Sequence, residues 1–259
     1  MRMMKKVLGT VTVLALSVSL LAGCGSTAAS PVSSAASTAA ESTTSSVVSE
    51  TTSAAADENE AAAAQLLNDL TGSYQELWPV ILADEYKQTW LDDCTALVGE
   101  DNAEAAFEKL SSMVTGDVYG EDAVKAYANG GGAYFCGFTN SLATLTFDGE
   151  TSTISGTDKD GNVLFSHTYH YIGMEPVRGL YEFESDDADS GEFTYFFLAP
   201  DTSAETYHIE FRYGSDADAL SQYDAGDYAY WVASGISTDC DQTMIDNCIE
   251  LFCTENLAD

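Results

Sequence analysis

Apolar residues recur at spacings of three and four over the first half of the chain, a pattern typical of helices with one buried face. The pattern is strongest over residues 84–98 and 103–114, after an alanine-rich acidic stretch at residues 57–70. We therefore expect the chain to be helical up to about residue 129. The same spacing predicts a further helix near the C-terminus, over residues 241–256. One face of that helix carries Met244, Ile245, Cys248, Leu251 and Phe252.

After three glycines at residues 130–132 the pattern changes to short segments rich in aromatic and β-branched residues, which favour strands. These segments are residues 142–147, 162–171, 180–184, 193–198 and 206–212. Turn-forming residues separate them, at residues 148–149, 160–161, 173, 185–191 and 199–201. Successive short strands with tight turns predict an antiparallel meander, closed or nearly closed into a barrel. The expected fold class is α+β, mainly β, with flanking N- and C-terminal helices.

The N-terminus has the parts of a secretory signal: a basic start, an apolar stretch over residues 7–21, and small residues after it. The apolar stretch is too short to span a bilayer. Its end, Leu-Ala-Gly-Cys at residues 21–24, resembles the bacterial lipobox, in which cleavage precedes a cysteine that receives a lipid. We therefore expect Cys24 to be lipidated and the protein to be extracytoplasmic, held to the bacterial membrane through that lipid.

Serine, threonine and alanine make up most of residues 25–56, which contain no aromatic residue and have little to bury. Such a segment is expected to be a flexible tether. The predicted organisation is a signal peptide over residues 1–23, the lipidated cysteine and tether over residues 24–60, and a folded domain over residues 61–259.

The chain carries a formal charge of −33, with nine basic residues against 42 acidic ones. This charge would repel DNA, RNA and anionic membrane surfaces, so nucleic acid is excluded as a partner. The sequence also lacks glycine-rich nucleotide-binding motifs and the Gly-x-Ser-x-Gly elbow of hydrolases. No motif indicates an enzyme. Because the chain is strongly negative, small cations are better suited as ligands than anionic molecules.

Lipidation of Cys24 leaves five cysteines, an odd number, so at least one thiol is expected to be unpaired. The five are Cys94, Cys136, Cys240, Cys248 and Cys253. The last two lie five residues apart on the predicted C-terminal helix, where their separation and direction disfavour a mutual bridge. We expect buried thiols, or one bridge between partners that the sequence does not identify.

Two acidic runs, residues 158–162 and 186–192, lack the loop pattern of an EF-hand and are interpreted as solvated hairpin turns. His167 and His170 lie an odd number of residues apart on one predicted strand, so they point to opposite faces and are not expected to share an ion. On the last predicted strand, His208 lies on a polar face opposite an apolar one. That polar face would meet solvent or line a barrel mouth.

The segment Leu-Asn-Asp-Leu-Thr-Gly-Ser-Tyr-Gln-Glu-Leu-Trp-Pro at residues 67–79 resembles the opening segment of the ZinT family of extracytoplasmic zinc-binding proteins. Further short motifs follow in the family's order, at residues 179–184, 193–195, 207–209 and 214–216. The resemblance covers most of residues 65–255. It implies a lipocalin-like (calycin) β-barrel with added helices, in agreement with the meander and helices expected above.

The resemblance also implies a zinc ion at the barrel mouth, held by three histidines. Two of these form a His-x-His pair that matches Thr206 and His208, so this chain keeps only the second histidine. The family's remaining histidine, which precedes this pair, aligns with Asp201 when no gap is introduced. Another placement of the alignment gap would put Phe196 there. The candidate metal ligands are therefore His208 and Asp201, with Glu205 as a replacement carboxylate.

One nitrogen and two oxygen ligands select zinc less strongly than three imidazoles, and would admit manganese, cadmium or another divalent ion. The resemblance implies a surface lipoprotein that captures or buffers a divalent metal, with zinc first, and that hands it to the binding protein of a metal importer. The alternative is a lipocalin-like module without the metal, which binds a small organic ligand or a partner protein.

Overall fold

The computed structural model describes residues 58–199 and 208–258, and all of them belong to the second of two compact units, residues 44–259. The predicted signal peptide, Cys24 and the tether up to residue 57 lie outside the described residues. A helix over residues 58–69 is the first element of the described residues. None of the helices in the described ranges has the length and apolar character needed to span a bilayer.

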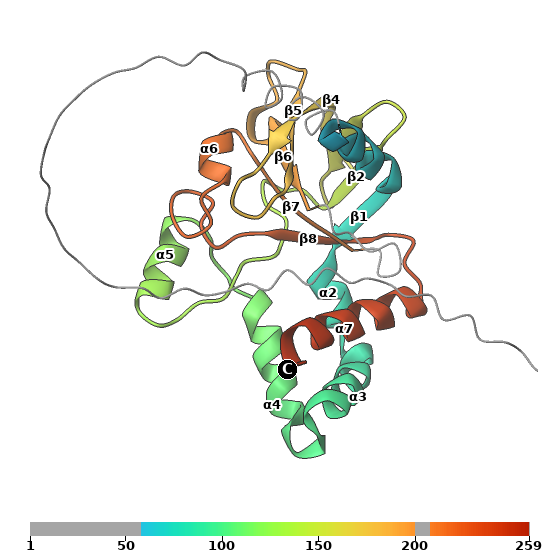
Figure 1. The fold of residues 1–259 in the computed structure, drawn as a ribbon, viewed down its shortest axis with the longest axis vertical. Coiled ribbons are helices and arrows are strands. Elements are labelled where there is room, and N and C mark those ends of the chain that lie inside the picture. Colours follow the sequence, from blue (N-terminus) through green and yellow to red (C-terminus); the bar gives the residue numbers. More distant parts are fainter. Residues whose placement is uncertain (1–57, 200–207, 259) are drawn as a thin grey trace, which may run out of the picture. The chain divides into compact units, whose positions relative to one another are not determined.

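Eight antiparallel strands close into a barrel in which each strand pairs with its neighbours in the sequence, and the last pairs back with the first (Figure 1). The strands are β1 (Gly72–Glu76), β2 (Thr144–Asp148), β3 (Thr153–Thr157), β4 (Val163–Met174), β5 (Tyr181–Ser185), β6 (Tyr195–Leu198), β7 (His208–Gly214) and β8 (Ala233–Ser237). This up-and-down order is that of a lipocalin-like barrel, and closure leaves no strand edge without a partner.

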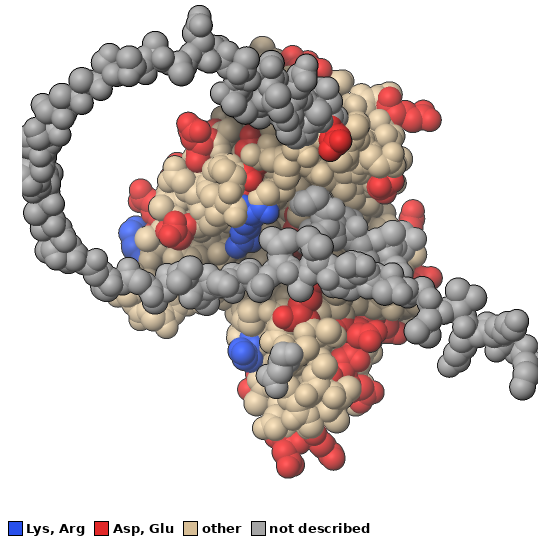
Figure 2. All heavy atoms as spheres, in the orientation of Figure 1, with Lys and Arg blue, Asp and Glu red and all other residues tan. Residues whose placement is uncertain are grey.

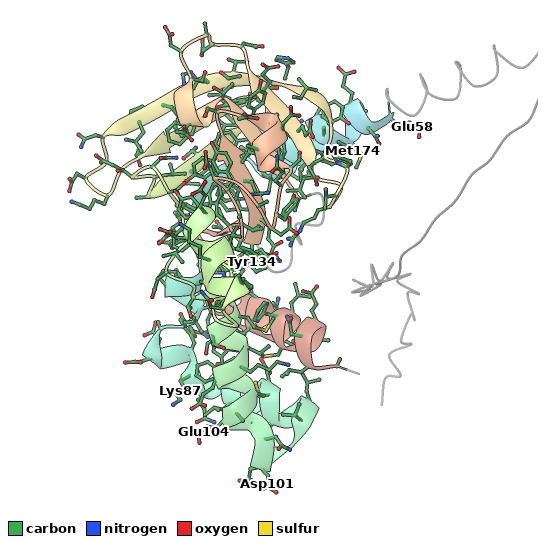
Figure 3. The ribbon with its side chains drawn as sticks, turned by 90° about the vertical axis from the view of Figure 1, so that its left-hand side faces the viewer. Glu58, Lys87, Asp101, Glu104, Tyr134 and Met174 are labelled. Carbon is green, nitrogen blue, oxygen red and sulfur yellow. The ribbon has the colours of Figure 1, made fainter. Side chains whose placement is uncertain are left out.

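Helices occupy the long connection between β1 and β2, the connection between β7 and β8, and the C-terminus. They are α2 (Leu77–Ile81), α3 (Lys87–Val98), α4 (Glu100–Val114), α5 (Glu121–Ala128), α6 (Ala217–Leu220) and α7 (Gln242–Leu257), with short 3-10 turns at Asp84–Tyr86 and Gly191–Phe193. Helices α3, α4 and α7 pack together outside the barrel, and the labelled Asp101 marks the end of this group farthest from the strands (Figures 1 and 3). The predicted α+β fold, mainly β with flanking helices, is confirmed.

Aromatic side chains fill the inside of the barrel. Phe196, Phe211 and Tyr213 are fully buried, and neighbouring ring centroids among them lie 5.4–6.3 Å apart. Trp231 meets Tyr213 edge-on at 5.0 Å and donates its indole N–H to the backbone oxygen of Gly137 at 2.9 Å. Large rings in contact of this kind bury much apolar surface and hold the strands in register.

A second core lies between the helices and the outer face of the barrel wall. Trp90 is fully buried there and donates its indole N–H to the backbone oxygen of Ile81 at 2.7 Å. Ile236 of β8 belongs to this core rather than to the barrel interior. The outer face of β8 is therefore the surface on which the helices pack.

The structure corrects two expectations about local structure. The chain was expected to be helical up to residue 129, but residues 72–76 form β1, because pairing with both β2 and β8 outweighs the weak local preference of Gly-Ser-Tyr-Gln-Glu. Gly173 was expected to be a turn, but it lies within β4 at a register shift, where a glycine allows a β-bulge. The turn comes later, where the buried Glu175 carboxylate accepts the backbone N–H groups of Val177 and Arg178 at 2.6 and 2.7 Å.

Candidate functional site

His208 is the first described residue of β7, and its side chain lies on the outer face of the barrel wall. Ile209 and Phe211 alternate with it and are buried among the residues of the barrel interior. Across the ladder, His208 pairs with Ile236, which belongs to the helical core. The sequence correctly separates a polar from an apolar face on this strand, and the polar face is turned toward the helices.

A small pocket with a volume of about 70 Å³ lies between this strand face and the helices α2 and α7. Its lining residues are Leu77, Trp78, Ile81, His208, Glu210, Cys248, Leu251, Phe252 and Glu255. The volume is several times what one water molecule needs and far below that of pockets for drug-sized ligands, which run to roughly 300 Å³ or more. The pocket therefore has room for an ion with a few water molecules.

The chemistry of this pocket comes from four side chains: one imidazole, two carboxylates and one thiol. Burial raises the pKa of the Cys248 thiol to about 12, and the negative charges of Glu210 and Glu255 contribute to the shift. The thiol is therefore protonated at neutral pH. His208, Glu210 and Glu255 each interact with other groups of the protein. A cation in this pocket would face an imidazole and an excess of negative charge, which is the setting that divalent metals favour.

Within residues 58–199 and 208–258, no three His, Cys, Asp or Glu side chains gather closely enough to hold a metal ion by themselves. The other predicted ligands, Asp201 and Glu205, lie outside the described residues, as do Thr206 and the lipidation site Cys24. The structure thus places one of the three predicted metal ligands, and it places that one beside a pocket.

The other two histidines lie away from this pocket, on β4, and each contacts a different carboxylate of the acidic turn between β5 and β6. The His167 Nδ1 atom lies 2.7 Å from an Asp187 oxygen, and the His170 Nδ1 atom lies 2.7 Å from an Asp186 oxygen. The His167 side chain is 18% exposed and that of His170 is 52% exposed. They occupy opposite faces of the strand, as the odd spacing predicts.

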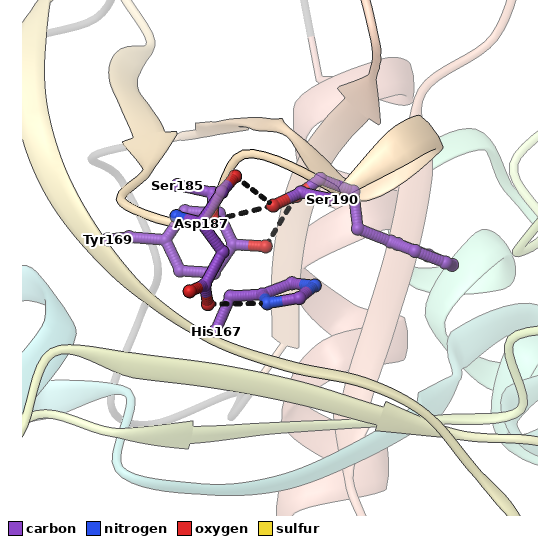
Figure 4. Close-up of polar contacts among 6 residues, drawn as sticks. His167, Tyr169, Ser185, Asp187 and Ser190 are labelled. Atoms are coloured by element: carbon purple, nitrogen blue, oxygen red, sulfur yellow. Dashed lines mark hydrogen bonds and ion pairs between the residues drawn. The ribbon is translucent and has the colours of Figure 1, made fainter.

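The acidic turn is held by its own hydrogen bonds (Figure 4). The buried Ser190 hydroxyl lies 2.8 Å from both the Ser185 hydroxyl and the backbone oxygen of Asp187. The phenol of Tyr169 donates to the backbone oxygen of Phe193. This run is a hairpin connection, as interpreted from the sequence. The other acidic run is also a hairpin turn, in which Asp158 accepts the backbone N–H groups of residues 160 and 162.

All five described cysteines have free thiols, and four of them are buried. The burial of these four side chains is compatible with both expected alternatives, buried thiols or one bridge. Acidic side chains are spread over the visible surface of the described residues and outnumber the basic ones (Figure 2). The lysines that lie in ion pairs are exposed and each contacts a nearby aspartate, Lys125 with Asp122 and Lys159 with Asp160.

No protein-family profile and no curated protein sequence matches this chain. Among solved structures, the chain is similar to the zinc(II)-bound ZinT-like domain of AdcA from Streptococcus pneumoniae, with 16% identity and a TM-score of 0.45, over 71% of this chain and 89% of that domain. It is also similar to the zinc(II)-bound AdcA of the same organism, with 14% identity and a TM-score of 0.42, over 74% of this chain and 35% of the other.

Three residues of the pocket were not among the predicted ligands: Glu210, Cys248 and Glu255. Glu210 shares the polar face of β7 with His208, so the two-residue strand period could have added it to the candidates. Cys248 was assigned to the apolar face of the C-terminal helix, and nothing in the sequence indicates which strand that helix contacts. It lines the same pocket as His208, although the two residues lie on segments far apart in the chain.

Proposed function

We propose that this chain is a lipoprotein anchored outside the cytoplasm whose barrel domain captures a divalent metal ion, with zinc preferred. His208 supplies an imidazole nitrogen to the ion. Asp201 and Glu205, which precede His208 by seven and three residues, supply carboxylate oxygens. The metal is cargo rather than a catalytic centre, and the protein holds it or passes it to the binding protein of a metal importer.

The observation that carries this proposal is the position of His208 beside a small pocket that also contains Glu210, Glu255 and Cys248. Imidazole nitrogen and carboxylate oxygen are ligand types that zinc accepts in proteins, whereas the protonated Cys248 thiol is not counted among the ligands. The two described carboxylates attract a cation into the pocket even where they do not bind it directly. A formal charge of −33 on the whole chain adds a diffuse attraction for cations.

The packing of the barrel interior argues against the alternative of a small organic ligand inside the barrel. Phe147, Phe183, Phe196, Phe211 and Tyr213 each have at most 1% of their surface exposed. Barrels that hold a ligand keep an interior space for it, whereas here aromatic rings in mutual contact occupy the interior. The pocket outside the wall, beside His208, is therefore the better candidate for a binding site.

The lipid anchor is proposed on the sequence alone, from the lipobox-like residues that end at Cys24. A lipidated cysteine followed by a serine- and threonine-rich segment would hold the metal-binding domain at a distance from the membrane. Such a placement suits a protein that collects a scarce ion before transport.

Calorimetric titration of the metal-free protein with zinc tests the proposal, with His208→Ala beside the wild type. We expect one site in the wild type and a loss of affinity of about 100-fold or more in the variant, because loss of a direct ligand costs at least as much as loss of its supporting partners. Asp201→Asn is expected to weaken binding as well. Titration with manganese should give weaker binding than zinc, because an imidazole nitrogen favours zinc.

The matched control is His170→Ala, which removes an exposed histidine on β4 that contacts Asp186. This variant should bind zinc as the wild type does. Equal zinc affinity in the wild type and His208→Ala, or the same loss in His170→Ala, would contradict the proposed site.

A further inference from the structure

We propose that Cys94 and Cys253 are the sites of a disulfide bond that ties α3 to α7 when the protein folds under oxidising conditions. The two Sγ atoms lie 3.9 Å apart. Both side chains are fully buried in the helical core, and the two helices pack directly against each other. The proposal rests on these two residues and does not depend on metal binding.

The placement of the two cysteines favours a bond. Each lies within its helix rather than at a frayed end: Cys94 within Lys87–Val98 and Cys253 within Gln242–Leu257. The sulfur atoms already contact each other, and a disulfide requires them to approach to about 2.05 Å. Rotation about the Cα–Cβ bonds moves a cysteine sulfur without moving the helix backbone.

The other described cysteines are placed differently. The Cys136 thiol points to the backbone oxygen of Tyr134, with the sulfur 3.9 Å from it. Cys240 is only half-buried and lies just before α7, and Cys248 lines the pocket beside His208. Cys94 and Cys253 are therefore the pair whose sulfurs the fold brings into contact.

The bond would form by thiol–disulfide exchange with a small-molecule or protein disulfide. One cysteine thiolate attacks the reagent disulfide, forms a mixed disulfide and releases one reagent thiol. The second thiolate then attacks the protein sulfur of that mixed disulfide and releases the other reagent thiol. The two protein thiols lose two electrons and two protons, and the reagent disulfide gains them.

Burial determines when this exchange can occur. Desolvation raises the pKa of both thiols, so few thiolates exist in the folded protein, and a reagent cannot reach sulfurs that are fully buried. The exchange must therefore take place during folding, before the helical core closes. Once formed, the bond is shielded from reductants in the native state.

The bond would also fix a wall of the pocket. Cys253 faces α3, whereas Cys248, Leu251, Phe252 and Glu255 of the same helix line the pocket. A crosslink on one side of α7 would hold the other side in place against β7.

Peptide mapping tests the proposal on the full chain, refolded in a buffer of reduced and oxidised glutathione. Free thiols are alkylated after unfolding, and the digest is analysed by mass spectrometry without reduction. We expect the peptide containing Cys94 linked to the peptide containing Cys253, and loss of this species after reduction of the unfolded chain. The linked species should persist in Cys240→Ser, which removes the half-buried cysteine.

Cys94→Ser should leave Cys253 alkylated, and Cys253→Ser should leave Cys94 alkylated. If either variant fails to fold, the peptide maps of the wild type and of Cys240→Ser still show whether Cys94 and Cys253 are linked. Alkylation of both Cys94 and Cys253 in the folded, oxidised wild type, or a link from either to another cysteine, would overturn the proposal.

Discussion

The three histidines of this chain show how neighbouring groups determine the role of one residue type. His167 and His170 each contact an aspartate of the acidic turn, and His208 lies beside a small acidic pocket. The odd spacing on β4 was sufficient to predict that the first two point to opposite faces of the strand. Their partners could not be predicted, because the pairing of Asp186 and Asp187 with them depends on the register between β4 and β5.

Asp93 on α3 is a residue whose charge opposes folding. Burial raises its pKa, and nearby Glu250, Asp246 and Asp92 add to the shift. Its Oδ2 atom is buried without a hydrogen-bond partner among the described residues. Because the folded state prefers the protonated form, stability falls as the pH rises from the unfolded-state pKa through the raised folded-state pKa.

We therefore expect Asp93→Asn to raise the melting temperature at pH 7 by about 2 °C, since the amide carries no charge. The difference from the wild type should shrink as the pH is lowered through the raised pKa of Asp93. Thermal unfolding at pH 7 and pH 4 measures both effects. Asp224→Asn, which changes an exposed carboxylate, is the control and should have little effect. A lower melting temperature for Asp93→Asn at pH 7 would refute this account of Asp93.

At the scale of elements, the helices could be predicted from the sequence because each has one buried face. The strands could be predicted only where their residues are large. The sequence correctly predicts α3, α4 and α7 from apolar spacing. It did not predict β8, whose residues Ala-Ser-Gly-Ile-Ser include four small ones. A Cβ at Gly235 would lie 3.1 Å from Ile209 Cγ1 and 3.4 Å from the backbone oxygen of Gln75, so close packing on this strand restricts side-chain size. Small residues favour no strand in isolation, and pairing with β7 and β1 supplies the stability.

The N-terminus of α7 depends on Asp241, whose carboxylate accepts the backbone N–H of Met244 at 3.0 Å. Asp241→Ala removes this cap and should lower the free energy of unfolding by about 1 kcal/mol. Asp241→Asn keeps a capping oxygen and should cost clearly less. Urea unfolding of the three proteins measures the difference. Equal stability of the alanine and asparagine variants would show that the cap hydrogen bond contributes little.

At the scale of the whole molecule, the described residues form two cores that share the wall of the barrel. The change from helical to strand spacing near residue 130 correctly predicts that both kinds of element exist and that the strands form a meander, closed or nearly closed, which the structure shows to be closed. It does not predict that α2 and α7 lie beside His208 and Glu210 of β7. That packing brings Trp78, His208 and Cys248 to one pocket from three distant parts of the sequence. Such contacts leave no trace in local periodicity, so the surroundings of His208 could not be predicted.

The central claim is that His208 binds a divalent metal ion beside the pocket between β7 and α7. Anomalous diffraction at the zinc absorption edge, from crystals of the protein loaded with one equivalent of zinc, tests it most directly. We expect a single strong peak about 2.0–2.1 Å from a ring nitrogen of His208. A peak at His167 and Asp187 instead, or no ordered zinc near His208, would contradict it.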